Sequence, residues 1–180
     1  MLQGDKIFLR PLEPDDLDVL YRWENDPDNW KISQTLTPFS RDLLIKYLEN
    51  SHLDIFQVKQ LRFVVAEMNS ARPVGLIDLF DFEPLHQRAG IGILIGEHID
   101  RKKGYAGEAL SVLLDYCFNT LILNQVYCNI PESNKSSAML FKKAGFRKSG
   151  IRKNWIRTPE GWEDENFYQI MRQDWLSSKS

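Results

Sequence analysis

One segment, residues 89–107 (AGIGILIGEHIDRKKGYAG), constrains the fold of this chain more than any other. It begins with Ala89–Ile95, an almost unbroken apolar run that is typical of a strand covered on both faces in the middle of a sheet. A basic loop with glycines follows and leads directly into Tyr105–Leu121, where apolar residues recur at helical spacing. This order of strand, glycine loop and helix predicts an α/β domain.

The loop has the chemistry of a phosphate-binding site. Gly104 and Gly107 lack a Cβ, so the backbone can approach a ligand closely there. The first amides of the helix have no carbonyl partner within it and lie at the positive end of its dipole. Arg101, Lys102 and Lys103 add positive charge at the same place. The segment therefore predicts a bound phosphate group at the start of the helix.

The rest of the chain completes one mixed domain, which we expect to span residues 1–180. Strands are expected at Lys6–Leu12, Leu61–Met68, Val74–Phe82, Ala89–Ile95, Gln125–Ile130 and in a final hairpin around the turn Thr158–Gly161. Helices are expected after Pro14 and at Arg41–Asn50, Tyr105–Leu121 and Lys135–Lys143. Short connections make the three middle strands antiparallel, and the helix crossover makes the next strand pair parallel. The fold class is therefore α/β (α+β), with a mixed central sheet of about seven strands and about four helices.

Composition and charge exclude several other classes of protein. The formal net charge is −2, whereas nucleic-acid binders carry a basic excess. No apolar run approaches the roughly 20 residues that span a bilayer, and the first residues lack the layout of a signal peptide. We therefore expect a cytoplasmic protein with neither a nucleic-acid nor a membrane partner. Cys117 and Cys128 are expected to be reduced core thiols. His52, His86 and His98 stand too far apart for a local metal motif, so no metal site is predicted.

Two motifs give the chain a resemblance to a known family. Arg101-x-x-Gly104-x-Ala106 resembles the pyrophosphate-binding signature, Gln/Arg-x-x-Gly-x-Gly/Ala, of the GNAT superfamily of N-acetyltransferases. Asn134, followed by a short helix and the turn after Phe141, resembles the second CoA-contacting element of that superfamily, in the same order. The resemblance covers nearly the whole chain. It is closest to the ribosomal-protein alanine N-acetyltransferase and spermidine N-acetyltransferase types.

The resemblance implies a fold, an activity and a co-substrate. It implies the GNAT fold, in which a parallel strand pair is splayed at the acetyl-CoA site, and acetyl transfer from acetyl-CoA to a primary amine by direct attack on the thioester. In the relatives the pantetheine arm pairs with the strand that corresponds to Gly92–Ile95. The implied cofactor-binding residues are Gly92, Ile93, Leu94, Ile95, Arg101, Lys102, Lys103, Gly104, Tyr105, Ala106, Gly107, Asn134, Ser137, Phe141 and Lys142.

Acetyl transfer to an amine also needs a group that accepts a proton, because an alkyl amine with a pKa of about 10 is mostly protonated at neutral pH. Asp78 and Asp81 stand three residues apart on a strand, so they are expected on opposite faces. We favour Asp81, because the corresponding acidic position in the polyamine relatives faces the acceptor. Glu97 and His86 are the next candidates. A carboxylate that is merely exposed to water is the alternative interpretation of Asp81.

Phe141 departs from the superfamily pattern. Many relatives carry a tyrosine there that protonates the departing thiolate, and phenylalanine has no proton to give. Tyr105, Tyr127 or water could take this role. A non-catalytic acyl-CoA-binding module therefore remains as an alternative to an active enzyme.

The acceptor is indicated only by weaker signals. Polyamine-acetylating relatives concentrate carboxylates in the loop after the first helix, whereas residues 29–38 of this chain contain none. Trp30, Leu36 and Phe39 suggest a more apolar entrance, which suits a peptide or protein N-terminus or a small amine. Residues 163–165, all acidic, could meet a positive charge or form a solvated face. A polyamine acceptor and a homodimer both remain open.

Overall fold

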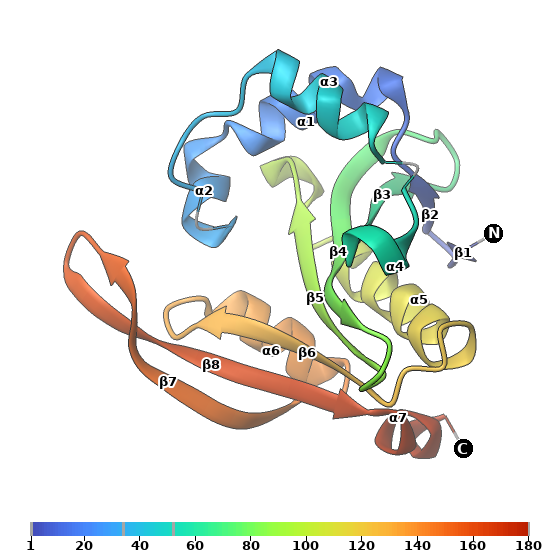
Figure 1. Cartoon of the computed structure of the whole chain (residues 1–180), viewed down its shortest axis with the longest axis vertical. Helices are drawn as coiled ribbons and strands as arrows, with labels where there is room; N and C mark the ends of the chain where they lie inside the picture. The colour runs from blue at the N-terminus through green and yellow to red at the C-terminus, as the bar shows by residue number, and fades with distance from the viewer. Residues whose placement is uncertain (1, 34, 52, 180) are drawn as a thin grey trace.

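An eight-stranded mixed sheet organises the molecule (Figure 1). The structure is a computed structural model that describes residues 2–33, 35–51 and 53–179. The strands are β1 (Leu2–Gln3), β2 (Ile7–Pro11), β3 (Leu61–Glu67), β4 (Pro73–Glu83), β5 (Arg88–Ile95), β6 (Gln125–Pro131), β7 (Arg147–Thr158) and β8 (Gly161–Met171). The helices are α1 (Leu17–Glu24), α2 (Pro27–Ser33), α3 (Arg41–Glu49), α4 (Ile55–Val58), α5 (Tyr105–Asn119), α6 (Lys135–Lys143) and α7 (Arg172–Ser178), with 3-10 turns at Pro14–Asp16 and His98–Asp100.

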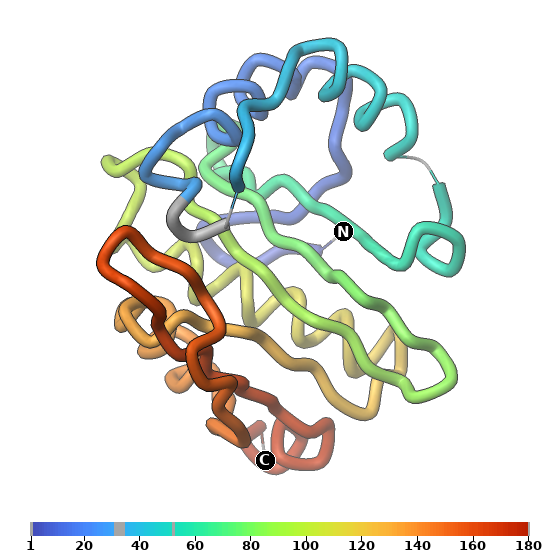
Figure 2. Tube along the Cα trace, turned by 60° about the vertical axis from the view of Figure 1, so that its left-hand side comes forward, coloured from blue at the N-terminus to red at the C-terminus, as the bar shows by residue number. Residues whose placement is uncertain are grey.

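The strand order is β1-β2-β3-β4-β5-β6-β8-β7. β5 and β6 run parallel, joined by the α5 crossover, and the other neighbouring strands of the described sheet are antiparallel. The predicted mixed sheet is therefore confirmed. Helices α1 and α3 lie over the part of the sheet that contains β3 and β4, whereas the β7–β8 hairpin forms one edge of the sheet (Figures 1 and 2).

The core lies on both faces of the sheet. On one face α5 buries Ala109, Leu110 and Leu113 against strand residues such as Ile77 and Ile91. A smaller cluster on the other face brings α1 and α3 onto the sheet, and its buried members are Leu12, Leu20, Trp23, Leu44, Leu48, Val64 and Leu76. Each fully buried aliphatic side chain stabilises the fold by about 1.5–3 kcal/mol. The apolar stripe predicted for the long helix is the face that packs on the sheet.

Local signals in the sequence end and begin several elements as expected. The Ser40 hydroxyl caps α3 by accepting a hydrogen bond from the Leu43 amide at 3.1 Å. Gly145, with φ +97°, follows the end of α6 as a left-handed residue. Thr158 pairs with Gly161 across the turn of the β7–β8 hairpin.

The sequence analysis missed four elements, namely β1, α2, α4 and α7. Residues 29–38 were expected to form the loop after the first helix, but α2 starts at Pro27 and continues to Ser33. Asp26 accepts a hydrogen bond from the Asp28 amide at 2.9 Å, and a proline at the first helical position suits a helix start as well as a stop. Gln34 of the expected loop and His52 lie outside the described residues. None of the described helices is long and apolar enough to cross a membrane.

Candidate active site

The parallel strands β5 and β6 separate partway along their length. Their pairing runs from Arg88 opposite Gln125 to Gly90 opposite Tyr127 and stops there. β5 stays paired with β4 as far as Ile95, and β6 stays paired with β8 as far as Pro131. Each strand therefore follows its outer neighbour, and the two strands diverge (Figure 1). Burial changes at the same point, because residues 89–91 are buried whereas residues 92–95 are partly exposed. The second half of β5 therefore presents an edge that β6 does not cover.

The loop before α5 presents a row of free backbone amides. Within the part of the chain that the structure describes, the amides of residues 102–107 donate to no acceptor, whereas Arg101 donates to the His98 carbonyl and Glu108 to the Gly104 carbonyl. Gly104 adopts φ +91°, and a Cβ there would meet only Lys6 Nζ, at 3.7 Å. Successive free amides at a helix start form an anion-binding site. The structure thus fits a phosphate at the predicted place.

A charged network beneath this loop fixes its position. The buried Asp100 carboxylate accepts two hydrogen bonds from the Arg72 guanidinium, both at 2.8 Å, and one from Lys103 Nζ at 3.1 Å. These hydrogen bonds hold the pKa of Asp100 below its usual range, and the bonds from Arg72 contribute most. Arg72 also pairs with Glu67, which accepts a hydrogen bond from the Tyr105 hydroxyl at 2.6 Å. Sequence analysis assigned Lys103 and Tyr105 to the cofactor; their side-chain polar atoms are engaged in this network, whereas their backbone amides are free.

The remaining basic side chains of the loop diverge. Arg101 reaches toward α2, with a nitrogen 3.3 Å from Asn29 Oδ1 and another 3.2 Å from His98 Nδ1. Lys102 is exposed, with φ +63°. Lys6, which the sequence analysis missed, places its Nζ 3.4 Å from the Lys103 carbonyl. Lys6 stands just before β2, nearly a hundred residues before the loop, so no local pattern could reveal this contact.

The second predicted element, around Asn134, lies beside the first. A Cβ on Gly107 would be 3.9 Å from Leu140, so α6 adjoins the start of α5. Asn134 caps α6 by accepting a hydrogen bond from the Ser137 amide at 3.1 Å. Phe141 is buried and packs edge-to-face against Phe146, with ring centroids 5.0 Å apart. This packing accounts for phenylalanine at position 141.

Lys142 belongs to the same helix, and its ammonium group contacts an aromatic ring. Its Nζ lies 5.9 Å from the centroid of the Tyr168 ring, over the ring face. This contact leaves the three donors of the ammonium group open to an anion. The assignment of Lys142 and Asn134 to cofactor binding stays a prediction.

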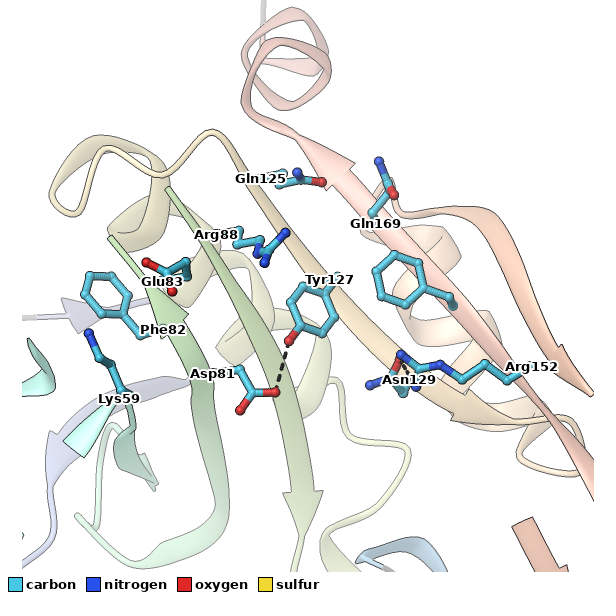
Figure 3. Close-up of a pocket in the computed structure, with 11 residues that line it drawn as sticks. Lys59, Asp81, Phe82, Glu83, Arg88, Gln125, Tyr127, Asn129, Arg152 and Gln169 are labelled. Atoms are coloured by element: carbon cyan, nitrogen blue, oxygen red, sulfur yellow. Dashed lines mark hydrogen bonds between the residues drawn. The ribbon is translucent and has the colours of Figure 1, made fainter. Parts of the chain in front are cut away.

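Asp81 lies next to a tyrosine at the base of the opening between β5 and β6. The Tyr127 hydroxyl donates a hydrogen bond to Asp81 Oδ2 at 3.2 Å (Figure 3). Burial, followed by the charge and hydrogen bond of Asp81, raises the pKa of Tyr127 to about 12. Tyr127 is also the last residue of β6 that pairs with β5, so the pair marks the point where the strands separate. Two groups that can exchange protons therefore adjoin the opening.

The backbone around Asp81 explains how it reaches Tyr127. The β4–β5 register shifts between Phe80 and Glu83, and Asp81 itself has φ +47°. This irregularity interrupts the alternation that was expected to place Asp78 and Asp81 on opposite faces. Asp78 faces α1 and α3, where Arg62 holds it at 2.6 Å, and Asp81 reaches Tyr127, whose ring contacts Phe80 on the same face.

The other candidate bases are placed less favourably. Glu97 accepts a hydrogen bond from Trp23 Nε1 at 3.1 Å and pairs with Arg22 at 3.1 Å. His86 is exposed in the turn between β4 and β5. No cluster of three or more His, Cys, Asp or Glu side chains that could hold a metal ion occurs among residues 2–33, 35–51 and 53–179.

An open pocket of about 760 Å³ surrounds Asp81 and Tyr127 (Figure 3). It lies on the side of the sheet that carries Phe80, between the turn after β4 and the β7–β8 hairpin. Its lining residues are Lys59, Asp81, Phe82, Glu83, Arg88, Gln125, Tyr127, Asn129, Arg152, Phe167 and Gln169. We call it the Asp81 pocket.

Comparison with known proteins agrees with this geometry. A family model described as "Acetyltransferase (GNAT) domain" matches residues 6–147. The chain is 26% identical to an uncharacterized N-acetyltransferase, p20, of Bacillus licheniformis, over 97% of each chain. It is 25% identical to a probable N-acetyltransferase, YjcK, of Bacillus subtilis, over 97% of this chain and 98% of that one.

The solved structures include a similar fold with its ligands bound. A spermidine N-acetyltransferase from Vibrio cholerae, solved with CoA and spermine, superimposes with a TM-score of 0.86 at 25% identity. The match covers 96% of this chain and 99% of that one. Since the family model spans most of the sequence and the strands part beside a helix start that is open to a phosphate, the chain belongs to the GNAT family of acetyltransferases.

Proposed function

We propose that the protein binds acetyl-CoA in the opening between β5 and β6 and transfers its acetyl group to a primary amine. The observation that carries this proposal is the row of free amides at residues 102–107, beside a parallel strand pair that separates after Gly90. The relatives with N-acetyltransferase names and the CoA-bound Vibrio cholerae structure support it. We further propose that the protein acts in the cytoplasm.

The residues around the opening fit the parts of acetyl-CoA. The amides of residues 102–107 would hold the pyrophosphate, with Lys6 and Lys102 adding positive charge. The uncovered edge of β5 at residues 92–95 would pair with the amide groups of the pantetheine arm. Asn134, Ser137 and Lys142 at α6 would flank the arm on the other side. When bound, acetyl-CoA supplies an activated acyl group on a thiol that leaves readily.

The chain's own contribution to the chemistry is centred on Asp81. Attack by the amine forms a carbon–nitrogen bond and breaks the carbon–sulfur bond, and a proton must leave the nitrogen. Asp81 is a carboxylate within the pocket and is held by one hydrogen bond from Tyr127, so it can accept that proton. Tyr127 positions this carboxylate, and its raised pKa keeps the hydroxyl protonated at neutral pH. Because the raised pKa makes this hydroxyl a weaker acid than a free phenol, we assign protonation of the departing thiolate to water, in place of the tyrosine that Phe141 replaces.

The acceptor that we propose is a peptide or protein N-terminus or a small amine. In support, the apolar residues Trp30 and Phe39 lie beside α1: Trp30 Nε1 donates to the Glu24 carbonyl at 2.6 Å, and Phe39 packs against the cluster that contains Leu20. A polyamine acceptor is the second candidate, because the Vibrio cholerae enzyme of similar fold is described with spermine. Another structure of that enzyme is described as dodecameric, and self-association of this chain, as a homodimer or larger, belongs to the same proposal.

The first experiment measures CoA release from acetyl-CoA in the presence of different amines. The panel contains peptides beginning with Ala, Ser or Met, then spermidine and small primary amines. Release with one class establishes the activity and identifies the acceptor class. If acetyl-CoA binds but no amine releases CoA, the chain is a non-catalytic acyl-CoA-binding module.

A substitution at Asp81 tests the proposed proton acceptor. We expect Asp81→Asn to lower kcat about 10²–10⁴-fold, the usual contribution of acid–base catalysis, with acetyl-CoA affinity unchanged. Asp42→Asn on α3, which removes an exposed carboxylate paired with Lys46, is the matched control and should keep full activity. Full activity of Asp81→Asn would show that the proton leaves by another route.

A further inference from the structure

The charges of the Asp81 pocket are not those of a polycation site. Three cationic side chains, Lys59, Arg88 and Arg152, line it together with two carboxylates, Asp81 and Glu83. A polyamine carries several positive charges and would require an excess of carboxylates around it. The lining residues provide no such excess.

The ion pairs and hydrogen bonds of these side chains determine which charges of the lining are unpaired. Arg152 is neutralised by Glu165, which is buried and 2.6 Å away, and also contacts Asn129 at 3.2 Å. Lys59 and Arg88 have no hydrogen bond or ion pair through their side chains among the described residues. The pocket wall is therefore left with two unpaired cations, Lys59 and Arg88, and two carboxylates without an ion pair, Asp81 and Glu83, among the described residues.

Arg88 shares the pocket face with the proposed reaction centre. The parallel register places Arg88 opposite Gln125 and Gly90 opposite Tyr127, so Arg88 and Tyr127 project to the same face of neighbouring strands. Figure 3 shows the Arg88 guanidinium extending over the pocket beside Tyr127. The positive charge of Arg88 is also felt at the Tyr127 hydroxyl, where it partly offsets the upward shift of the pKa.

These observations describe a pocket with a carboxylate at one point and an unpaired guanidinium a short way along the same wall. An amine at Asp81 would be attracted by that carboxylate. A carboxylate or phosphate on the same molecule would meet Arg88, whose planar group can bind either anion through two hydrogen bonds. The volume of about 760 Å³ is sufficient for a small metabolite.

We propose that the acceptor bears an anionic group, a carboxylate or a phosphate, in addition to its primary amine, and that Arg88 binds this group. The proposal rests on the proposed function, since it specifies the acceptor of the same reaction. Arg88 is then the residue that determines specificity.

The test compares acceptors of equal length that differ in one end group. CoA release is measured with 6-aminohexanoate, hexylamine and 1,6-diaminohexane, and with O-phosphoethanolamine against ethanolamine. We expect kcat/KM for the anionic member to exceed that of its neutral and cationic partners at least tenfold. The two anionic compounds distinguish a carboxylate from a phosphate.

Substitutions assign the preference to Arg88. Arg88→Gln should lower kcat/KM for the anionic acceptors about tenfold relative to that for hexylamine, and Arg88→Glu should shift the preference toward 1,6-diaminohexane. Arg157→Gln, an exposed arginine near the tip of the β7–β8 hairpin, is the control and should change neither. A preference for the diamine that Arg88→Gln leaves unaltered would overturn the proposal while the proposed function stands.

A direct binding measurement separates the two proposals if no amine is turned over. Ligand-observed NMR of 6-aminohexanoate with the CoA-bound protein reports occupancy of the pocket without chemistry. Binding that Arg88→Gln abolishes would support the anion subsite although the proposed activity had failed. Absence of binding to the wild-type protein would overturn both.

Discussion

At the scale of single residues, Asp81 shows how one irregular backbone position creates a site. On a regular strand its side chain would lie on the face opposite Asp78, with the core packed against α5. The left-handed φ of +47° and the shifted register at this point instead bring its carboxylate to the Tyr127 hydroxyl. Asp78 is meanwhile held by Arg62 in an ion pair with two hydrogen bonds and is not free to act on a substrate.

Gly104 is the residue whose replacement tests the proposed cofactor loop. A side chain would stand among the free amides of residues 102–107, so Gly104→Val should weaken acetyl-CoA binding at least tenfold. It should also cost about 1–2 kcal/mol in the free energy of unfolding, because an L-residue is strained at φ +91°. Calorimetric titration with acetyl-CoA and thermal unfolding measure the two effects separately.

Gly161 provides the matched control for this substitution. It also has a positive φ, of +134°, but a Cβ there would meet nothing within 4 Å, and it lies in the hairpin turn away from the loop. Gly161→Val should therefore lose stability and keep its affinity for acetyl-CoA. Unchanged affinity in Gly104→Val would exclude the loop as the pyrophosphate site.

At the scale of elements, the loop before α5 owes its shape to a neighbouring strand rather than to its own sequence. Arg72 stands just before β4 and binds the buried carboxylate of Asp100, which lies in the 3-10 turn leading into the loop. Tyr105, the first residue of α5, is tied through Glu67 to the end of β3. These two connections belong to one ion network, because Arg72 also pairs with Glu67, and the network positions the loop that carries the free amides.

We expect the Arg72→Gln substitution to raise the KM for acetyl-CoA about tenfold, or about 1.4 kcal/mol, with kcat nearly unchanged. The physical reason is that Asp100 would lose its two-bond partner, while Lys103 still partly compensates its charge. Arg41→Gln, which breaks an exposed pair with Asp18, is the control. A large loss of kcat at saturating acetyl-CoA would mean that the network acts on the reaction itself rather than on the loop.

At the scale of the whole molecule, the separation of β5 and β6 is set by the sheet as a unit. Each strand keeps its outer neighbour to the end while the pairing between them stops, and Figure 1 shows β6 and the β7–β8 hairpin turning away from β5. Cys128 follows Tyr127, the last residue of β6 that pairs with β5. It is nevertheless buried, as is Cys117 on α5. The opening therefore lies above a closed core, and burial raises the pKa of both thiols.

Both cysteines should be unreactive toward a thiol reagent in the native protein and reactive after denaturation. The reason is that the reagent needs an exposed thiolate, which only opening of the core can provide. Time-resolved labelling with a chromogenic disulfide measures the rate at which the two thiols react. The same measurement gives the protein's own contribution to the signal in a thiol-based CoA assay. Rapid labelling of native Cys128, slowed by acetyl-CoA, would instead indicate that the opening extends into the core.

Much of this architecture was determined by the sequence alone. The apolar run of β5, the stripe on α5, the cap at Ser40 and the glycine after α6 are local patterns, and the elements they predict are present at nearly the predicted bounds. The family could be recognised because the phosphate loop is a contiguous segment whose backbone, more than its side chains, makes the site. The helix at Pro27 was missed because Asp-Pro can start a helix as well as end one.

The tertiary structure decided which side chains are free to act. The side chains of Lys103 and Tyr105 looked available in sequence, but Asp100 and Glu67 engage them, and Lys6 reaches the loop from just before β2. The pairing of Asp81 with Tyr127 and the position of Arg88 depend on a bulge and on the register between β5 and β6. The physical reason is that local periodicity reports burial and backbone conformation, whereas the partners of a charged group are set by contacts between segments that only folding brings together.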